Sequence, residues 1–405
     1  MRVLYVSQYF VSADQPGGVR HWQHTRALER AGHDVSVVTS YVQHKERTIP
    51  ERYRGRRVVR EQEDGLDVWR TYSTPGYGRD LRSRLASYGS FATWASAAMM
   101  RAPRPDVVVA SSPSLPAAAA AALVARARGA RFVMEVRDLW PDSAVAMGLV
   151  SDPRVITAAR AMERLCYRTA DRVIALTEGI RDGVVAQGVP AAKVVLITNG
   201  VDLEWAGASA PEPVAAPVPE GAFVAMYVGA HGTYSSLETV LEAAALLRDR
   251  PDVAVVLVGG GDRKPALQAQ AAARGLQNVR FVDPVPKREV PRWLARADVC
   301  LLPYQDRALF AGALPNKTFD YLAAARPVLV AAPVGELTRL VASAGCGVCV
   351  PPEDPRAMAD ALRRLADDAA GRREMGARGR TVALERYDRR ALAKRFVALV
   401  ESVGG

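Results

Sequence analysis

Short runs of valine, isoleucine and leucine alternate with helical patterns along the 405-residue chain, and this alternation limits the possible folds most strongly. The first run is Val3–Val6; a helical pattern then ends before Gly32, and a second run starts at Val35. Similar runs occur at 107–109, 131–136, 173–176, 194–197, 223–228, 253–258, 279–282, 299–302, 327–331 and 347–350. Short buried strands that alternate with helices are typical of βαβ units. We therefore predict an α/β protein with parallel sheets.

A stretch rich in proline and alanine, residues 206–221, divides this alternation into two halves. It contains four prolines and shows no periodicity, which is typical of a semi-rigid linker. We predict two Rossmann-like domains, with bounds 1–205 and 223–386, joined by a linker at 206–222. Residues 387–405 are expected to form a helix that crosses back to the first domain. Because ligands of open parallel sheets lie beyond the carboxyl ends of the strands, we expect the site in the cleft between the domains.

The composition limits which binding partners and which cellular compartment we expect. The net charge is +11, and since the chain has only six lysines, 48 of its 54 basic residues are arginine. This bias resembles GC-rich coding more than a nucleic-acid surface, so we expect anionic partners such as nucleotides, diphosphates or acidic lipids and no nucleic acid. Four cysteines fit a reducing compartment. The longest apolar stretch, 117–125, is too short to span a membrane, and no signal-peptide core is present, so we expect a cytoplasmic protein.

The most informative segment is residues 310–331, FAGALPNKTFDYLAAARPVLVA. Pro315 suits the first position of a helix. The amides of Ala313 and Leu314 would then lie near a helix N-terminus, which favours an anion such as a diphosphate. Lys317 adds a positive charge at the same place. An ordinary capped helix before a buried strand is the alternative interpretation.

This segment resembles the nucleotide-sugar motif of the retaining glycosyltransferases of family 4. The resemblance implies the GT-B fold, in which two Rossmann-like domains face a central cleft, with the acceptor on the N-terminal side and the nucleotide sugar on the C-terminal side. Family members carry two glutamates eight positions apart. Asp320 takes the second position, which holds the ribose, whereas Gly312 takes the first, which contacts the donor sugar. The usual sugar-contacting carboxylate is therefore absent.

Landmarks in the N-terminal half agree with this resemblance. Gly17 and Gly18 resemble the glycine loop beside the donor phosphates. Residues 136–142, VRDLWPD, are similar to a stretch found in the branch that builds surface polysaccharides from N-acetylated or deoxy sugars. Many relatives carry a histidine where Arg137 stands. The resemblance implies that Arg137 and Asp138 face the reacting sugar and are the catalytic residues.

The C-terminal half carries further landmarks. Residues 227–232 resemble the first strand and loop of the family's nucleotide domain, and residues 281–285 resemble the strand end that frames the base. Relatives often carry arginine and lysine near 233–236, where this chain has none, so diphosphate neutralisation falls to Lys317, the helix amides, and Lys264 or Arg263. The implied donor-binding residues are Gly17, Gly18, Gly229, His231, Gly232, Lys264, Val282, Pro284, Gly312, Ala313, Leu314, Lys317 and Asp320.

We expect neither a metal site nor a bound cofactor. Asp138 and Asp142 have no second carboxylate cluster beside them in sequence, and family members generally stabilise the leaving diphosphate with cations and helix dipoles. The donor is a substrate, for which a UDP-type nucleotide is favoured by the resemblance. Cys346 and Cys349 have CxxC spacing but lie in a strand pattern, which predicts a structural role.

A basic stretch in the first half leaves two interpretations open. Residues 45–84 contain 11 basic and 7 acidic residues, a net charge of +4, and a helical pattern follows with Tyr88, Phe91 and Trp94. One interpretation is a solvated loop with a helix that faces the core. The other is an acceptor-binding edge or a peripheral contact with the inner face of a membrane.

The resemblance implies a glycosyltransferase that moves a sugar from a nucleoside diphosphate sugar to an acceptor hydroxyl with retention, in polysaccharide or natural-product biosynthesis. A nucleotide-sugar epimerase of the same fold is one alternative. A non-catalytic nucleotide-binding partner is another, because the acidic residue at 312 and the basic pair are absent. A hydride-transfer enzyme is not expected, since the first βα turn lacks a GxGxxG fingerprint.

Overall fold

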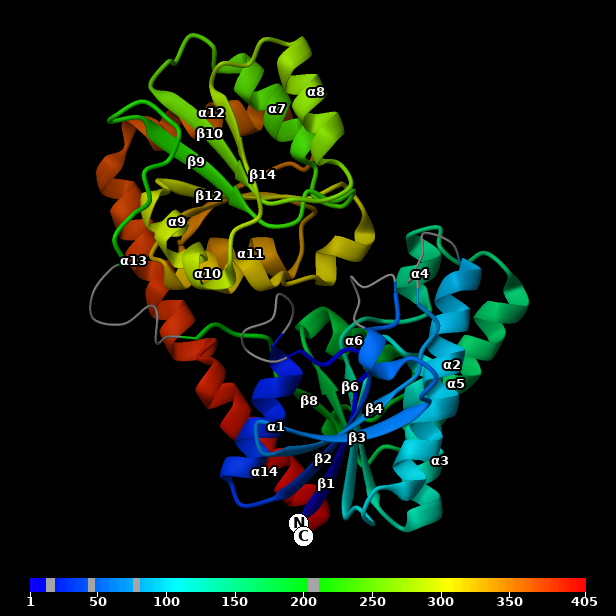
Figure 1. The fold of residues 1–405 in the computed structure, drawn as a ribbon. Helices are drawn as coiled ribbons and strands as arrows, with labels where there is room; N and C mark the ends of the chain where they lie inside the picture. The colour runs from blue at the N-terminus through cyan, green and yellow to red at the C-terminus, as the bar shows by residue number, and fades with distance from the viewer. Residues whose placement is uncertain (12–18, 43–47, 76–80, 203–210) are drawn as a thin grey trace. The chain divides into compact units, whose positions relative to one another are not determined.

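A computed structural model describes residues 1–11, 19–42, 48–75, 81–202 and 211–405 (Figure 1). The chain folds into two compact units: unit 1 contains Met1–Thr198 and Ala391–Gly405, and unit 2 contains Asn199–Arg390. Each unit has its own sheet, mainly parallel in unit 1 and fully parallel in unit 2, covered by helices, so the predicted α/β fold with two such domains is confirmed. Among the described residues, no helix is both long and apolar enough to cross a bilayer.

Unit 1 is built on an eight-stranded sheet with the order β3-β4-β2-β1-β5-β6-β7-β8, in which only the β3–β4 pair is antiparallel. The strands are β1 (Arg2–Val6), β2 (Asp34–Ser40), β3 (Val58–Glu63), β4 (Leu66–Thr71), β5 (Val107–Ser111), β6 (Arg131–Val136), β7 (Arg172–Ala175) and β8 (Val194–Leu196). The chain order reverses between β1 and β5. Ligands of open sheets bind at such a switch point, beyond the carboxyl ends of the strands.

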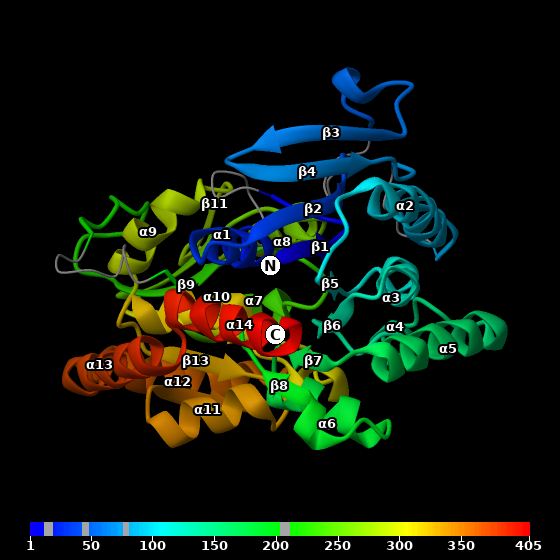
Figure 2. The same ribbon diagram turned by 90° about the horizontal axis from the view of Figure 1, so that it is seen from below.

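Helices cover both faces of this sheet (Figures 1 and 2). They are α1 (Arg20–Arg30), α2 (Leu81–Arg101), α3 (Leu115–Arg128), α4 (Asp142–Ala146), α5 (Pro153–Thr169), α6 (Glu178–Ala186) and α14 (Arg389–Gly404). One core joins α2, α3 and α5 to the sheet, and a second core joins α1 and α14 to the opposite face through Leu28 and Phe396. The last residues, 391–405, thus belong to unit 1 although they follow unit 2 in sequence.

The β3–β4 hairpin lies within the stretch 45–84, which the sequence indicates to be rich in loops. Glu63 pairs with Leu66, so that Asp64 and Gly65 form a two-residue turn, and both have positive φ (50° and 82°). Asp-Gly is a preferred pair for this type of hairpin turn. The helix that follows presents Tyr88 and Phe91 to the core of unit 1, as the first of the two interpretations expected.

Unit 2 is built on a six-stranded parallel sheet with the order β11-β10-β9-β12-β13-β14. Its strands are β9 (Phe223–Val228), β10 (Val253–Val258), β11 (Val279–Val282), β12 (Val299–Pro303), β13 (Val328–Ala331) and β14 (Gly347–Val350). Its helices are α7 (Leu237–Leu246), α8 (Lys264–Ala273), α9 (Val290–Arg296), α10 (Asn316–Ala323), α11 (Glu336–Ala344), α12 (Pro355–Asp367) and α13 (Ala369–Arg386). Here the order reverses between β9 and β12, so their carboxyl ends mark the switch point.

The described part of the expected linker packs on unit 2. The backbone N–H of Val214 donates to the carbonyl of Arg292 over 3.3 Å, and Arg280 Nε donates to the carbonyl of Pro217 over 2.9 Å. Val214 and Val218 also contact the core of this unit. Residues 211–222 are therefore a surface strap of unit 2, and the boundary between the units falls after residue 198.

Candidate active site

Lys317, on the first turn of α10, lies against the end of β9 in unit 2. Its Nζ donates to Tyr227 Oη over 2.6 Å and lies 4.0 Å from the centre of the Tyr227 ring. Tyr227 Oη donates to the carbonyl of Ala230 over 2.7 Å, which fixes the phenol. Burial lowers the pKa of Lys317 to about 7. No other acceptor for Nζ occurs among the described residues, so two of its three N–H groups are available to a ligand.

The start of α10 supplies further donors beside this cation. The backbone N–H groups of Leu314, Asn316 and Lys317 have no acceptor within the described part of the chain. These groups begin a helix and carry its partial positive charge, which favours an anion. The predicted donor Ala313 is different, because its N–H already bonds the carbonyl of Phe310 over 3.2 Å. That amide closes the short turn Ala308–Gly312 and is not available to a diphosphate.

Asp320 lies one turn further along α10 and is half-buried. Burial raises the pKa of its carboxyl group to about 6, while the charges of Lys287 and Arg389 partly offset this effect. Burial also lowers the pKa of Lys287. The Asp320 carboxylate accepts no hydrogen bond from any described residue. An ionisable acceptor with free oxygens is therefore held close to Lys317 on the same helix.

Two glycine loops close the end of the sheet beside Lys317. A Cβ atom at Gly229 would lie 2.9 Å from Lys317 Nζ, so only glycine lets the lysine approach the end of β9. Gly259 follows β10 with a φ of 144°, and a Cβ atom there would lie 1.9 Å from the carbonyl oxygen of Gly229. At Gly232, by contrast, a Cβ atom would meet nothing within 4 Å. Gly259 is therefore required for the packing of these loops, Gly229 leaves room for the end of the Lys317 side chain, and Gly232 is not required.

His231 is a structural part of the same loops. Its backbone N–H donates to the carbonyl of Gly260 over 2.8 Å, and its carbonyl accepts from the N–H of Arg263 over 3.1 Å. The ring is fully buried, and neither ring nitrogen has a hydrogen-bond partner among the described residues. Burial, then the charges of Lys264 and Lys317, lower its pKa to about 4. The ring is therefore neutral at physiological pH.

Lys264 and Arg263, the other predicted phosphate cations, are already engaged. Lys264 Nζ donates to the carbonyls of Gly259 and Val282, each over 2.9 Å, and to Asp283 Oδ1 over 2.8 Å. All three of its N–H groups are thus used. Arg263 pairs with Glu238 of α7 over 2.5 Å. Lys264 ties the ends of β10 and β11 together, so the structure gives it a positioning role rather than a contact with phosphate.

Val282 and Pro284 stand at the end of β11, where the sequence predicts contact with the base. The carbonyl of Val282 accepts from the N–H of Gly259 over 3.0 Å in addition to Lys264. The Pro284 ring lies against Gly260, where a Cβ atom would approach it to 2.9 Å. Both residues are therefore next to the glycine loops, and their contact with a base stays a prediction.

Arg137 follows β6 in unit 1 and is fixed from two sides. Its Nη1 donates to His21 Nε2 over 2.8 Å, and its backbone N–H donates to Ser112 Oγ over 2.8 Å. Because a guanidinium only donates, the His21 proton lies on Nδ1, which donates to Tyr5 Oη over 2.9 Å. Burial, followed by the charge of Arg137, lowers the pKa of His21 to about 3. His21 is therefore a neutral acceptor that orients Arg137.

A buried ion pair supports this arrangement. Glu135 has no exposed surface; it accepts from Arg20 Nε and from Ser111 Oγ, each over 2.9 Å. Burial acts to raise the pKa of Glu135, but the charges of Arg20 and of the neighbouring basic groups, Arg137 among them, together outweigh it and hold the pKa below its usual range. Arg20 also donates to the carbonyls of Ile197 and Thr198. The pair thus joins the start of α1 to the ends of three strands.

Asp138 stands beside Arg137 at the end of β6. It is half-buried; burial raises its pKa, and the nearby Ser143 hydroxyl and the N–H of Leu139 partly offset this. Across the described residues, no group of three histidine, cysteine, aspartate or glutamate side chains could hold a metal ion. The two other predicted residues of unit 1, Gly17 and Gly18, lie outside the described residues.

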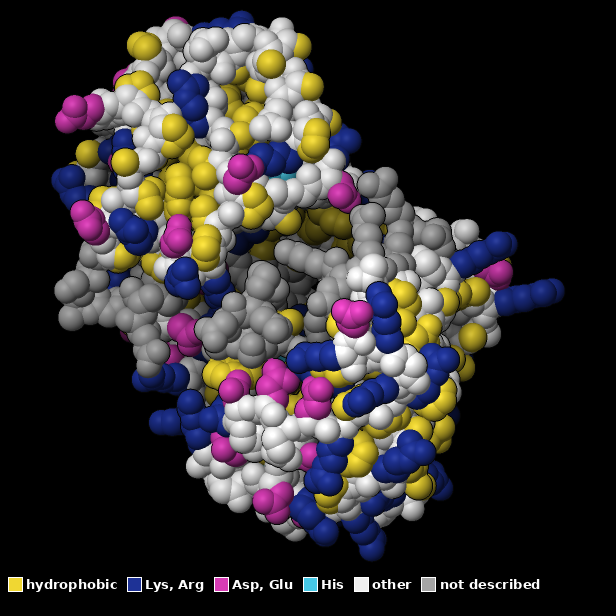
Figure 3. All heavy atoms as spheres, in the orientation of Figure 1, with side chains coloured by type: hydrophobic (Ala, Val, Ile, Leu, Met, Phe, Trp, Pro, Cys, Tyr) yellow, Lys and Arg dark blue, Asp and Glu magenta, His cyan; other side chains and the backbone are white. Residues whose placement is uncertain are grey.

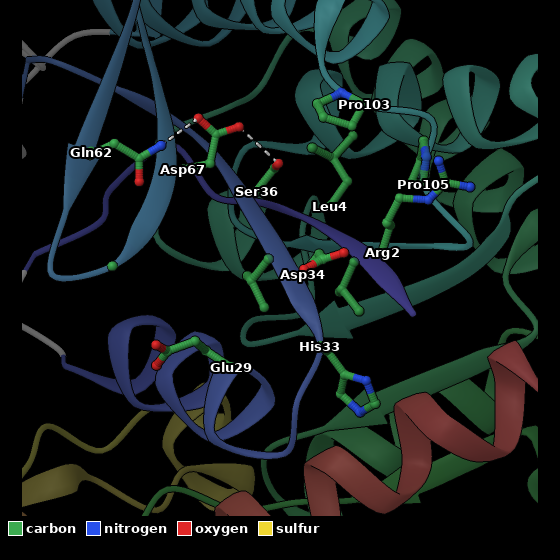
Figure 4. A pocket seen from close by; sticks show the side chains of 13 residues that line it. Arg2, Leu4, Glu29, His33, Asp34, Ser36, Gln62, Asp67, Pro103 and Pro105 are labelled. Atoms are coloured by element: carbon green, nitrogen blue, oxygen red, sulfur yellow. Dashed lines mark hydrogen bonds between the residues drawn. The ribbon is translucent and has the colours of Figure 1, made fainter.

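A hollow of about 310 Å³ lies elsewhere in unit 1, where β1 and β2 begin (Figure 4). Its walls include His33, Asp67 and Pro103. Asp67 accepts hydrogen bonds from Ser36 and Gln62, as the dashed lines in Figure 4 show. This hollow lies at the amino ends of the strands, opposite to the end where Arg137 lies. It is not part of the candidate active site.

Comparisons with known proteins match both halves of the chain in which the candidate site residues lie. A family model described as "Glycosyl transferase 4-like domain" matches residues 17–200, and one described as "Glycosyl transferases group 1" matches residues 222–368. The putative colanic acid biosynthesis glycosyl transferase WcaI of Escherichia coli (strain K12) is 30% identical over 83% of this chain and 85% of that protein. The chain belongs to glycosyltransferase family 4. It is therefore a transferase enzyme.

Other relatives and structures support this family-4 glycosyltransferase assignment. A D-inositol 3-phosphate glycosyltransferase of Kineococcus radiotolerans is 31% identical over 58% of each chain. Sucrose-phosphate synthase from Thermosynechococcus elongatus has a TM-score of 0.74 at 20% identity and covers 99% of this chain and 98% of its own. HepE of Anabaena in complex with UDP-glucose has a TM-score of 0.70 at 17% identity, over 99% and 100%. The predicted GT-B fold is confirmed by these structures.

Several residues that position or surround the candidate site residues were not predicted from the sequence. Tyr227 positions Lys317, yet a tyrosine in an apolar strand gives no sign of that contact. Lys287 lies near Asp320, and its only signal is the scarcity of lysine in this arginine-rich chain. Arg20 and Glu135 are 115 positions apart, and only the fold brings them together.

Proposed function

We propose that this family-4 glycosyltransferase transfers a sugar from a UDP-type nucleoside diphosphate sugar to an acceptor hydroxyl during glycan assembly. The main support is the group formed by Lys317, the free amides at the start of α10, and Asp320. A cation and N–H groups suit a diphosphate, and a carboxylate one turn away suits ribose hydroxyls. HepE, which has the same fold, was solved with UDP and with UDP-glucose, which also favours a UDP-type donor.

In this proposal the chemistry depends on charge at the leaving group. The bond between the anomeric carbon and the diphosphate oxygen breaks, the acceptor oxygen bonds to the same carbon, and the proton of the acceptor hydroxyl passes to the departing diphosphate. Negative charge then grows on the departing diphosphate. Lys317 and the α10 amides are already oriented before the reaction, so they stabilise this charge without reorganisation. Val282 and Pro284 frame the base, while Gly229 allows Lys317 to reach the diphosphate.

Arg137 and Asp138 act at the sugar in the same proposal. His21 and Ser112 fix Arg137, so that its guanidinium is held in one orientation at the end of β6. Asp138 supplies a carboxylate beside it. A fixed guanidinium suits the orientation of sugar hydroxyls. A carboxylate beside it suits the positive charge of an oxocarbenium-like centre.

Three finer features complete the proposal: transfer with retention, no requirement for a metal, and a cytoplasmic location. Retention follows from the family resemblance and is tested by NMR of the anomeric proton in the product. If no metal takes part, the rate is unchanged in excess EDTA. A rate that falls in EDTA and returns with Mg²⁺ or Mn²⁺ would contradict the second feature.

The decisive assay measures nucleoside diphosphate release with and without an acceptor. A glycosyltransferase releases more diphosphate when a suitable acceptor saccharide is added. An epimerase would alter the sugar without any acceptor, and a non-catalytic binding partner would release nothing. A thermal-shift panel of nucleoside diphosphates selects the donor base first, because a ligand that binds the folded state raises its melting temperature.

A further inference from the structure

Three helices of unit 1 form a continuous outer layer, here called the basic helical face: α2, α3 and α5. Helix α3 packs against both α2 and α5, and all three lie on the same side of the sheet (Figures 1 and 2). Their inner positions belong to one hydrophobic core. Their outer positions are left to face solvent.

The charge of this face is of one sign. The three helices contain nine arginines and a single acidic residue, Glu163. Glu163 is buried and accepts hydrogen bonds from Tyr167 and Gln187, so it does not offset the arginines at the surface. Five exposed arginines have no ion-pair or hydrogen-bond partner for the guanidinium among the described residues: Arg101, Arg126, Arg154, Arg164 and Arg168.

Other parts of the described chain carry both signs of charge: α12 contains Asp360 and Asp367, and α13 contains Glu374 and Glu385. In the β3–β4 hairpin, Arg60 pairs with Asp67 and Arg70 pairs with Glu61. In unit 2, Arg363 of α12 pairs with Asp249. Exposed arginines without an ion pair also occur outside the basic helical face, but the helices of this face differ from α12 and α13 in having no exposed acidic residue. Figure 3 shows dark blue arginine and lysine side chains around yellow apolar ones over the lower right of unit 1.

Apolar side chains stand between these arginines. Met100 is 55% exposed and Leu123 is 54% exposed, and each lies within three positions of an exposed arginine. The remaining outer positions include small exposed residues such as Ala127, Ala158 and Ala161, whose side chains hardly project from the helices. Of the aromatic side chains of α2, Tyr88 and Phe91 are buried, and Trp94 is half-buried with the Arg57 guanidinium over its ring, so the face lacks a row of open rings on which unstacked bases bind.

We propose that the basic helical face binds a bilayer surface that contains anionic lipids. Unpaired arginines attract anionic headgroups, and exposed methionine and leucine side chains enter the boundary between headgroups and acyl chains. The charge complementarity selects this occupant over a neutral bilayer. The proposal does not depend on the donor or the acceptor of the transferase, since the face lies on helices away from Lys317 and Asp320 in sequence and unit.

Flotation of the full-length protein with vesicles tests this inference. We expect binding to vesicles of phosphatidylcholine with one third phosphatidylglycerol, weaker binding in high salt, and little binding to phosphatidylcholine alone. The variant Arg101→Ser/Arg126→Ser/Arg164→Ser should need about tenfold to hundredfold more anionic lipid. The variant Leu123→Ser should lower the binding that survives at high salt.

A matched variant separates the face from total charge. Arg356→Ser/Arg373→Ser/Arg386→Ser removes three exposed arginines from α12 and α13 of unit 2 and should bind like the wild type. Melting temperatures of both triple variants show that they are folded. Equal flotation of the two triple variants, or equal wild-type binding to neutral vesicles, would overturn the proposal. So would arginine-dependent binding of duplex nucleic acid by a protein that leaves anionic vesicles unbound.

Discussion

Burial acts in opposite directions on the two charged groups of α10. It lowers the pKa of Lys317 to about 7 and raises the pKa of Asp320 to about 6. Lys317 is therefore charged mainly below pH 7, and Asp320 is ionised mainly above pH 6. Both groups carry the charge that a nucleoside diphosphate needs only in a narrow range around pH 6 to 7.

UDP affinity is accordingly expected to be highest near pH 6.5. Above pH 7 binding must add a proton to Lys317, so affinity falls by up to tenfold per pH unit. Below pH 6 binding must remove a proton from Asp320, so affinity falls again. Calorimetric titrations in buffers with different ionisation enthalpies measure both the affinity and the proton exchange.

Single substitutions assign each limb of this profile. Lys317→Met should abolish the decrease on the alkaline side and leave the acidic one. Asp320→Asn should do the reverse. A profile that keeps both limbs in both variants would show that other groups titrate.

Lys264 is expected to stabilise the fold rather than to bind phosphate. Lys264→Met leaves the carbonyls of Gly259 and Val282 without their ammonium donor, which should cost about 1–3 kcal/mol of unfolding free energy. Urea unfolding monitored by tryptophan fluorescence measures this loss. An unchanged unfolding free energy with UDP affinity lowered tenfold or more would instead place Lys264 in contact with the diphosphate.

At the scale of elements, the strands could be predicted because both faces of each sheet are covered. Runs such as Val253–Val258 have no polar alternation, and only buried parallel strands accept such a composition. The β3–β4 hairpin escaped prediction because its strands alternate charged and apolar residues within a basic stretch. The Asp64–Gly65 pair was its one clear local signal.

The candidate site was predictable only in part. The α10 motif was found because Lys317 and Asp320 are close in sequence. The engagement of Lys264 depends on the carbonyls of Gly259 and Val282, which different strands bring together. The amide of Ala313 is used in a turn whose geometry the sequence does not reveal. Contacts between distant elements are thus what the sequence could not provide.

The interlocking of the β9 and β10 loops gives a prediction for two glycines. Gly259→Ala places a methyl group against the carbonyl of Gly229 at a positive φ, so it should destabilise unit 2 by about 3 kcal/mol or more and abolish UDP binding. Gly232→Ala meets no atom within 4 Å and should be tolerated. Thermal unfolding of the two variants makes the comparison, and equal melting temperatures would contradict this packing.

At the scale of the whole molecule, the charge of +11 has separable parts. Many described arginines form ion pairs within their own unit, five exposed and unpaired ones lie on the basic helical face, and Lys317 belongs to the candidate site of unit 2. The excess of positive charge is therefore not confined to one surface. In the proposed function the two α/β units have different roles, with Arg137 and Asp138 of unit 1 at the sugar and the α10 group of unit 2 at the nucleotide.

The central claim is that Lys317 holds the diphosphate of the donor. Calorimetric titration of UDP at pH 6.5 into the wild type, Lys317→Met and the control Lys394→Met, an exposed lysine of α14, tests it most directly. We predict that Lys317→Met weakens UDP binding about tenfold to hundredfold, as expected for the loss of a charge-assisted hydrogen bond, and that Lys394→Met binds like the wild type. Equal UDP affinity in all three folded proteins would contradict the account.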